Sequence, residues 1–285
     1  MTEDLLSAKN VIVQGITGAH GAFHASAMKA SGTNVVAGTS PSKIGDTIDG
    51  IPVYGSIKDI QAAHAVDISV VFVPARFAKG ALIEAITAEV PLIVCITEGI
   101  PLHDMLAVTK ALKEKGRSQL IGPNCPGILL PGGNKLGIIP AHLSLAGSVG
   151  VVSRSGTLTY EAMDGLTRRG IGQKYIIGIG GDRIAGTSFI DCLRLFENDP
   201  DVDKIVMIGE IGGTGELDAA KYIKQHVTKP VYAYVTGHHA PAGVQLGHAG
   251  AILGSADESA AAKTEYLAEN GVHTATSITH LIHMI

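Results

Sequence analysis

The chain has 285 residues, a formal net charge of −4 and 46% hydrophobic residues, so it can bury a sizeable core and is long enough for two domains. Lysine and arginine are scattered rather than clustered, which argues against a nucleic-acid-binding or anionic-lipid-binding surface. No apolar run has the length of a membrane span, so we expect no membrane association.

The first predicted element is a strand at 10–14, which leads through a glycine turn at 15–22 into a helix that continues to Lys29. This order of strand, turn and helix resembles the dinucleotide fingerprint, in which a pyrophosphate lies at a helix N-terminus. The middle position of the fingerprint is Thr17 rather than glycine. The turn alone is weak evidence, because many α/β turns carry glycines for packing only.

The second predicted strand, at 34–38, ends in hydroxyl residues and Lys43. An NAD enzyme requires an acidic residue here to bind the ribose 2′-hydroxyl. Hydroxyls and a lysine favour a phosphate on the ribose instead, which is present in NADP and in coenzyme A.

The alternation continues with strands at 69–74, 92–96 and 119–121 and helices at 77–89 and 103–115. The strands are nearly continuous apolar runs, which is typical of a parallel sheet covered on both faces. We therefore predict a doubly wound α/β domain with its ligand across the carboxyl ends of the strands. The polar residues predicted at these ends are Thr17, Lys43, Thr97, Glu98 and Asn124.

A stretch rich in glycine and proline, at 126–147, interrupts the pattern, and we place the domain boundary there. The expected division is a first domain at 1–128, a linker at about 129–145 and a second domain at 146–285. The second domain again alternates, with strands predicted at 150–152, 175–179, 205–208 and 231–235. Both domains are therefore expected to be α/β.

Residues that follow three strands of the second domain are of types that together favour phosphoryl transfer. His248 lies in a loop of glycine and alanine, which leaves its imidazole uncrowded. A neutral imidazole can accept a phosphoryl group on one nitrogen when a carboxylate, here Glu210, fixes the other. Ser155, Gly156 and Thr157 open a helix whose N-terminus can bind phosphate. The simpler alternatives are a solvated histidine, a helix-capping glutamate and an ordinary serine N-cap.

Five blocks of the sequence resemble the α subunit of succinyl-CoA synthetase (succinate–CoA ligase), in order and over nearly the whole chain. They are Gly122–Gly127, Ser153–Glu161, Gly178–Asp182, Met207–Gly213 and Gly247–Ala251. The resemblance implies an α/β chain with an N-terminal Rossmann-like CoA-binding domain and a second, flavodoxin-like doubly wound domain that carries a phosphohistidine.

The resemblance also implies residue roles. His248 matches the phosphorylated histidine, and Glu210 matches the carboxylate that orients it. Tyr160 falls on the position that borders the substrate, and we place Asn124 beside it. The expected CoA contacts are Thr17, Gly18, Ala19, His20, Lys43, Ile96, Thr97 and Glu98.

The family's reaction converts succinyl-CoA, phosphate and a nucleoside diphosphate to succinate, CoA and the triphosphate, reversibly. We find no P-loop lysine and no acidic magnesium cluster in this chain. The resemblance therefore implies that ATP or GTP with magnesium is bound by an ATP-grasp β subunit, in a heterodimer or heterotetramer.

The chain departs from the family pattern around the histidine. Residues 240–246 lack the usual lysine or arginine, and a glycine-lysine-glycine stretch is missing after Leu253. Arg183, Ala185 and Arg76 replace prolines. Loss of positive charge beside a phosphoryl-carrying loop weakens charge neutralisation, which leaves the rate, the nucleotide and the acid open.

Other functions remain open at this point. The acid can be malate or another short dicarboxylate, or the chain can be a module similar to ATP citrate lyase. Two further hypotheses are a CoA-binding paralogue with impaired catalysis and an NADP oxidoreductase. Retention of His248, Glu210 and Ser155 argues against the former, and a missing proton-relay set argues against the latter.

The cysteines Cys95, Cys125 and Cys192 are odd in number and widely spaced. They form neither a disulfide framework nor a metal-ligand pattern, so we expect no metal site. The acidic N-terminus lacks a signal-peptide pattern, which favours the cytoplasm, although a processed organellar protein would have the same features.

Overall fold

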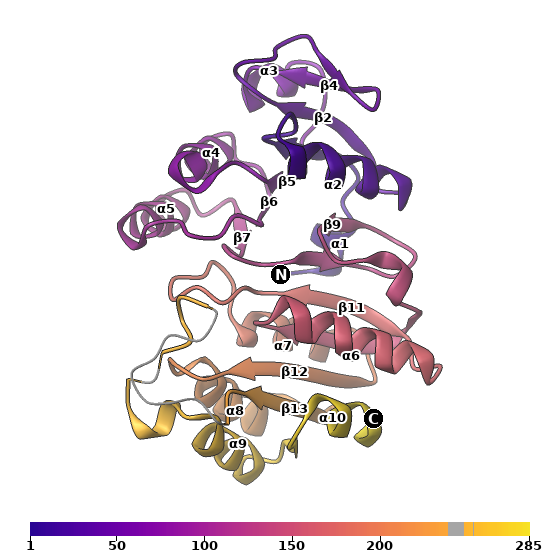
Figure 1. Ribbon diagram of the computed structural model, residues 1–285, viewed down its shortest axis with the longest axis vertical. Helices are drawn as coiled ribbons and strands as arrows, with labels where there is room; N and C mark the ends of the chain where they lie inside the picture. Colours follow the sequence, from indigo (N-terminus) through magenta and orange to yellow (C-terminus); the bar gives the residue numbers. More distant parts are fainter. Residues whose placement is uncertain (239–247, 253) are drawn as a thin grey trace.

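The computed structural model describes residues 1–238, 248–252 and 254–285. Figure 1 shows two α/β layers stacked along the long axis, with the N-terminal half above the C-terminal half. The described chain forms two seven-stranded sheets, one in each half. The expected α/β class with two domains is confirmed.

The first sheet has the strand order β3-β4-β2-β1-β5-β6-β7, and all neighbours except β3 and β4 are parallel. Without the edge strand β3, this is the order of a Rossmann domain. The order in which successive strands are added to the sheet reverses between β1 and β5, and such sheets bind ligands at this point. The strands are β1 (Val11–Gln14), β2 (Val35–Thr39), β3 (Thr47–Ile48), β4 (Ile51–Tyr54), β5 (Ile68–Val71), β6 (Leu92–Cys95) and β7 (Gln119–Ile121).

The strands β3 and β4 were not expected from the sequence. Pro52 lies within β4 and interrupts the apolar run, which hides the strand from pattern analysis. Its ring nitrogen cannot donate to a sheet ladder, and accordingly the strand lies next to the sheet edge.

Helices cover both faces of the first sheet. Ile12 faces the cluster formed with α3, α4 and α5, whereas Val11 and Val13 face α1 and α2. Figure 1 shows α4 and α5 on one side of β5–β7 and α2 on the other. The helices are α1 (Glu3–Leu6), α2 (Ala19–Ala30), α3 (Ile57–Gln61), α4 (Ala75–Thr87) and α5 (Leu102–Lys115).

The second sheet has the order β14-β13-β12-β10-β11-β8-β9. Its parallel strands β10 to β14 follow the flavodoxin-like order, and the chain reverses between β10 and β12. The strands are β8 (Gly127–Leu129), β9 (Lys135–Gly137), β10 (Ala146–Ser153), β11 (Gln173–Gly178), β12 (Lys204–Glu210), β13 (Val231–Thr236) and β14 (His273–Ala275).

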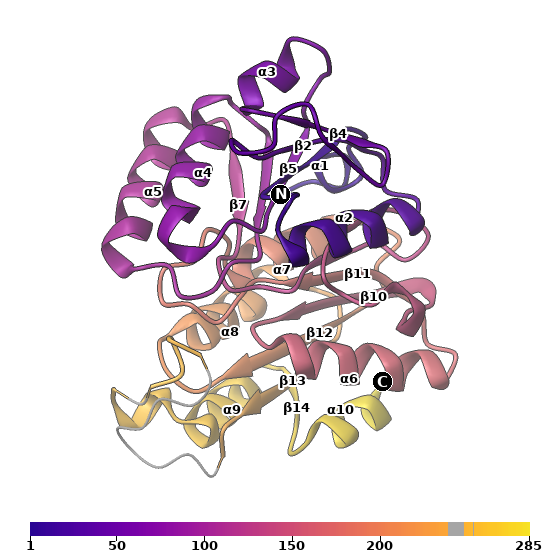
Figure 2. The ribbon, with the colours of Figure 1, turned by 45° about the horizontal axis from the view of Figure 1, so that its top comes forward.

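The helices of the second domain also form two layers. Val151 on β10 packs with α6 and α10, whereas its neighbour Val152 packs with α7, α8 and α9. Figure 2 shows α6 and α10 together on the near side of this sheet. The helices are α6 (Gly156–Arg168), α7 (Phe189–Asn198), α8 (Gly215–His226), α9 (Ala260–Glu269) and α10 (Ile278–Met284), with 3-10 turns at Ala141–Leu143 and Ala256–Glu258.

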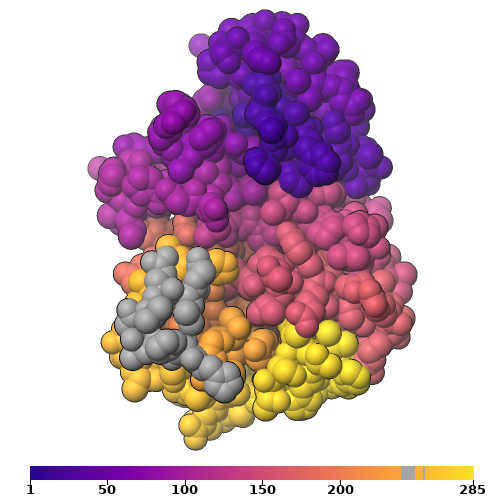
Figure 3. Space-filling model, viewed as in Figure 1, coloured from indigo at the N-terminus to yellow at the C-terminus, as the bar shows by residue number. Residues whose placement is uncertain are grey.

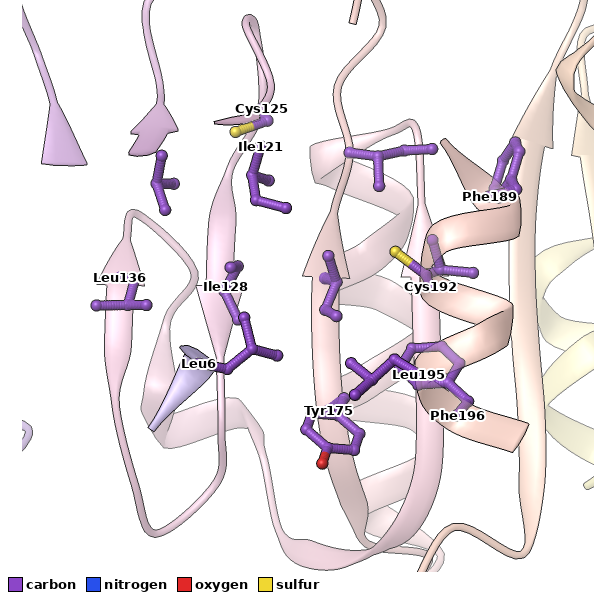
Figure 4. Packing of buried hydrophobic residues seen from close by; sticks show 14 of the residues in the cluster. Leu6, Ile121, Cys125, Ile128, Leu136, Tyr175, Phe189, Cys192, Leu195 and Phe196 are labelled. Atoms are coloured by element: carbon purple, nitrogen blue, oxygen red, sulfur yellow. The ribbon is translucent and has the colours of Figure 1, made fainter. Parts of the chain in front are cut away.

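The hairpin β8–β9 joins the two domains. It pairs antiparallel with β11 in the second sheet, although its residues fall across the boundary and linker that we expected from composition. Its residues Ile128 and Leu136 belong to a buried cluster that also contains Val13 of the first sheet and Phe196 of α7. Figure 4 shows this packing from Leu136 through Ile128 to Tyr175 and Phe196. The space-filling view shows the two halves in contact along a broad junction (Figure 3).

None of the helices that the structure describes is long and apolar enough to cross a membrane.

Candidate active site

The side chains of His248 and Glu210 are in direct contact. The Nδ1 atom of His248 lies 2.6 Å from Oε2 of Glu210. Glu210 ends β12 and is 3% exposed, so its carboxylate is held at the carboxyl edge of the second sheet. The hydrogen bond to this carboxylate raises the pKa of His248, and the positive charge of Arg154 works in the opposite direction. Because Nδ1 is used by Glu210, the ring nitrogen left for chemistry is Nε2.

Arg154 supplies a cation behind this pair. Arg154 follows β10, and Glu210 ends the neighbouring strand β12. The strand order reverses between these two strands, so both residues lie at the edge where such sheets bind ligands. The Nε atom of Arg154 lies 3.1 Å from Oε1 of Glu210. That oxygen is buried without a well-aligned hydrogen-bond donor, so the contact with Arg154 is an ion pair rather than a directed hydrogen bond.

Glycines allow the histidine loop to approach the strand ends. A Cβ atom on Gly181 would lie 2.3 Å from Cγ of His248, and one on Gly250 would lie 2.6 Å from the backbone oxygen of Gly181. The amide of Gly250 donates to that oxygen at 2.9 Å. Any larger residue at Gly181 therefore displaces the imidazole from its position beside Glu210.

His248 also lines a cavity of about 690 Å³ between the two domains. This size is within the range of small-molecule sites. Ten of the residues that we predicted for the site line it together: His20, Ile96, Thr97, Glu98, Asn124, Ser155, Gly156, Thr157, Tyr160 and His248. The structure thus brings the strand ends of the first domain and the histidine of the second domain to one space.

The N-terminus of α6 opens onto this cavity. Ser155 is its N-cap, and its hydroxyl accepts from the amide of Leu158 at 3.3 Å. The capping alternative is therefore correct for the Ser155 side chain. It does not exclude phosphate binding, because the first amides of a helix have no intrahelical partner and carry a partial positive charge.

Tyr160 projects toward the same helix N-terminus. A Cβ atom on Gly156 would lie 3.9 Å from its phenol oxygen. Burial raises the pKa of Tyr160 to about 12, so it stays protonated at neutral pH and can donate a hydrogen bond. The amide of Asn124 donates to Asp182 at 2.9 Å, which ties the end of the first domain to the loop after β11.

The remaining residues that we predicted for CoA are not among those that line the cavity. Thr17 and Gly18 precede α2, and Ala19 opens it. The hydroxyl of Thr17 lies 2.7 Å from that of Ser40, after β2. Lys43 is exposed in the following turn, where its amide donates to Ser40 at 3.2 Å.

The turn before α2 depends on two glycines. Gly15 has a φ of +80°, which side chains rarely adopt, and a Cβ on Gly21 would lie 2.2 Å from its carbonyl oxygen. These glycines let α2 pack against the end of β1, so that the helix N-terminus reaches the ligand-binding edge.

Sequence analysis missed several residues of the site. Arg154 and Asp182 lie within the recognised blocks, but their contacts depend on strands that are distant in sequence. Glu216 and Lys263 gave no signal, because a charged residue in a helical pattern ordinarily faces solvent. Both are 0% exposed here and lie behind Glu210.

The structure describes some of the residues that depart from the family pattern but not others. Residues 240–246 and Leu253 lie outside the described residues. Arg183 and Ala185 line a second cavity of about 680 Å³ in the second domain. The helix expected near Ala256 begins as a 3-10 turn, and α9 follows after Ser259, whose hydroxyl caps it.

The cysteines do not contribute reactive groups. Cys95, Cys125 and Cys192 are buried free thiols, and burial raises the pKa of Cys95 to about 12. Within the described parts of the chain, no group of three or more His, Cys, Asp or Glu residues is placed to hold a metal ion.

Comparison with known families identifies both halves of the chain. A model of the CoA binding domain matches residues 7–99, and a CoA-ligase model matches residues 152–273. The fold is therefore that of a two-domain CoA ligase, in which the first domain is a CoA-binding domain.

The sequence relatives are more specific. The chain is 49% identical to the ADP-forming succinate–CoA ligase subunit alpha of Aquifex aeolicus, over 92% of this chain and 87% of that protein. It is 46% identical to a subunit alpha of the same enzyme from Archaeoglobus fulgidus, over 95% of this chain and 93% of that protein. The chain belongs to the family of succinate–CoA ligase α subunits, as the resemblance of its sequence blocks implied.

A solved relative has the same fold in a longer chain. The ATP citrate lyase of Methanothrix soehngenii, in complex with citrate and coenzyme A, aligns with a TM-score of 0.84 and 26% identity over 98% of this chain. The present chain spans 50% of the length of that protein.

Proposed function

We propose that this chain is the α subunit of a nucleotide-dependent acid–CoA ligase whose acid is succinate. The reaction is succinyl-CoA, phosphate and a nucleoside diphosphate to succinate, CoA and the triphosphate, in either direction. The observation that carries the proposal is the His248–Glu210 pair, 2.6 Å apart, at a cavity that the CoA-binding domain also lines.

Glu210 gives His248 the form that phosphoryl transfer requires. Its carboxylate accepts the Nδ1 proton, so the lone pair of Nε2 is free to attack the phosphorus of an acyl phosphate. The P–N bond forms as the acyl P–O bond breaks, and the carboxylate of the acid departs with its electron pair. The ring then carries positive charge, which the anionic Glu210 stabilises without a further proton transfer.

The N-terminus of α6 supports the transferred group. In this proposal the amides of Gly156 and Thr157 donate to phosphate oxygens, and the helix dipole favours their negative charge. Tyr160 and Asn124 border the acid, with the protonated phenol as a donor to its carboxylate. These roles rest on the shared cavity and on the matched family blocks.

CoA supplies the thiol that forms the thioester. We propose that the turn formed by Thr17, Gly18, Ala19 and His20 binds it at the start of α2, together with Ile96, Thr97 and Glu98 after β6. Lys43 lies after β2, where a charged contact to a ribose phosphate is expected. Four of these residues line the cavity: His20, Ile96, Thr97 and Glu98.

The nucleotide is assigned to a partner chain. We propose an ATP-grasp β subunit that binds ATP or GTP with magnesium and forms a heterodimer or heterotetramer with this chain. The relatives are named as α subunits of ADP-forming enzymes, which supports a partner and favours ATP. The free thiols of all three cysteines support a reducing compartment, and we propose the cytoplasm.

The identity of the acid has one alternative with specific support. The similarity to an ATP citrate lyase over 98% of this chain shows that the same fold serves a different carboxylic acid in another protein. Malate or another short dicarboxylate is therefore the second candidate, and succinate is preferred because of the higher identity to succinate–CoA ligases.

The test is phosphorylation of His248. The chain, copurified with its native partner, is incubated with radiolabelled ATP and magnesium, and we expect a label that is acid-labile and base-stable. His248→Asn should abolish the label, and Glu210→Gln should retain the fold but slow labelling about 100-fold or more, because the amide cannot stabilise the charged ring. Persistent labelling of His248→Asn would contradict the assignment.

The partner requirement is measured in the same preparation. The isolated chain should bind CoA but make no thioester from succinate, ATP and CoA until the partner is added. Robust synthesis by the single chain would refute the two-subunit proposal, and synthesis with malate but not with succinate would favour the alternative acid.

A further inference from the structure

A buried lysine lies directly behind the His248–Glu210 pair. Lys263, on α9, is 0% exposed, although lysines are almost never fully buried unless they are paired. Its ammonium group donates to Oε2 of Glu216 at 2.5 Å and to the backbone oxygens of Glu210 and Gly212 at 2.8 Å each. All three donors of the ammonium group are therefore used.

Glu216 holds the opposite side of the same residue. It is also 0% exposed, and its Oε1 atom accepts from the backbone amide of Glu210 at 3.1 Å. The backbone of Glu210 is thus fixed at its carbonyl by Lys263 and at its amide by Glu216. These contacts leave the side chain of Glu210 free to reach His248.

Stability alone does not explain this buried pair. Removing two charges from water is costly, and an apolar pair of similar volume is often as stable or more stable. An apolar pair, however, cannot donate to the carbonyls of Glu210 and Gly212. Directional control of this backbone is therefore a property that the charged pair has and an apolar pair lacks.

The contact with Gly212 extends this control to the histidine loop. A Cβ atom on Gly212 would lie 2.2 Å from the carbonyl oxygen of Gly250, so these two segments pack backbone against backbone. Lys263 therefore fixes the strand end that carries Glu210 and also the turn on which the segment after His248 rests.

We propose that Lys263 and Glu216 are positioning residues, which fix the backbone of Glu210 so that its carboxylate is aimed at Nδ1 of His248. This inference rests on the proposed phosphohistidine function and adds the pair that prepares the site. It assigns no contact with substrate to either residue.

The test compares two variants of the chain, each copurified with its native partner. Lys263→Met alone removes the close cationic partner of the buried Glu216 carboxylate, leaving only Arg154 at 3.8 Å, and threatens folding. The informative variant is therefore Lys263→Met with Glu216→Gln. The control is Lys174→Met, which removes a lysine on β11 that pairs with Asp199 and Asp201 and with Glu3 of α1, none of which lines the cavity at His248. Melting temperature, phosphorylation rate with radiolabelled ATP and magnesium, and the pH profile of that rate are measured for each.

The pH profile separates positioning from simple stabilisation. Phosphorylation requires an unprotonated Nε2, so the phosphorylation rate falls at low pH as His248 becomes protonated. This acid limb of the pH profile follows the pKa of His248, which the contact with Glu210 raises. Displacement of Glu210 should move the acid limb to lower pH. The other charged groups that face His248 are Arg154 after β10 and Asp182 after β11, and His20 and Glu98 line the same cavity. None of them is substituted in either variant, although Glu216→Gln removes the 3.8 Å ion pair of Glu216 with Arg154.

We expect His248 of the double variant to be phosphorylated about 10- to 100-fold more slowly than in wild type, the range found when residues that orient a reacting side chain are removed. The acid limb of its pH profile should lie at lower pH. The control should label at the wild-type rate even if its melting temperature falls. Wild-type rate and acid limb in the double variant would overturn the inference, and so would a slower rate with an unchanged limb. Failure of wild type to label His248 would instead refute the proposed function.

Discussion

The ligand-binding edges of the two sheets are built differently. In the first domain, neutral hydroxyls of Thr17 and Ser40 meet 2.7 Å apart, and the nearby Lys43 is exposed. In the second domain, Glu210, Glu216 and Lys263 are buried and fix one another through contacts within the protein. An exposed edge can bind a large ligand through surface contacts, whereas charge that develops during a reaction requires groups that are already in place.

The largest expected effect follows from displacing the fixed histidine. Gly181→Ala adds a methyl group that would lie only 2.3 Å from Cγ of His248, so the imidazole must move. A displacement of about 1 Å can cost about 100-fold in rate, and we expect phosphorylation of His248 to fall by about that factor while CoA binding is retained. Rapid-quench labelling and calorimetric titration of CoA measure the two properties.

The matched control is Gly80→Ala on α4, where an added Cβ has no neighbour within 4 Å. It should leave both properties unchanged. Equal phosphorylation rates for Gly181→Ala and Gly80→Ala would show that the second domain tolerates movement of His248. The claim that its ligand-binding edge requires fixed side chains would then be wrong.

A smaller effect is expected at the exposed edge. Lys43→Ala should weaken CoA binding about tenfold, the lower end of the range for a hydrogen bond to a charged group, because Lys43 is solvent-exposed. Dephospho-CoA, which lacks the ribose phosphate, should bind wild type and variant about equally. If the variant prefers CoA over dephospho-CoA by the wild-type margin, the phosphate contact lies elsewhere.

The smallest effect concerns stability and pH. Because Glu210 raises the pKa of His248, the folded chain binds that proton more tightly than the unfolded chain. The resulting stabilisation is complete below the ordinary histidine pKa of about 6.5 and is lost as the pH rises through the higher folded-state value. Urea unfolding of wild type and His248→Gln from pH 5 to pH 9 should therefore show a wild-type advantage that shrinks toward alkaline pH. An advantage that grows with pH would contradict the coupling.

Much of the fold was predictable because its strands are apolar runs bounded by glycine. The strands that escaped prediction are short or interrupted, such as β4 with Pro52 and the hairpin β8–β9, whose pairing depends on β11 far along the chain. A sequence pattern reports the period of burial but not the partner of a short strand.

The candidate site was predictable to a similar degree. His248 and Glu210 were identified because a glycine-rich loop and a strand end mark chemistry, and the structure places them in contact. Lys263 and Glu216 were not identified, because only tertiary packing converts two ordinary helix residues into buried charges. The sequence also could not show which of the predicted residues line one cavity, because that depends on the order of the strands in the two sheets.

The hairpin β8–β9 has a consequence for recombination between proteins of this architecture. Asn134, in its turn, donates to the carbonyls of Leu6 and Ala8, and Thr33 of the first domain exchanges hydrogen bonds with Lys135. A chimera that exchanged the first domain at residue 128 would separate the hairpin from that domain, whereas a graft of residues 1–145 would keep the hydrogen bonds between the hairpin and the first domain. The recipient would then have to supply a strand that pairs with β8 as β11 does. Because of these shared hydrogen bonds, we expect the amides of the hairpin and of the N-terminal segment to exchange with solvent at similar rates. The two segments would then unfold as one cooperative unit.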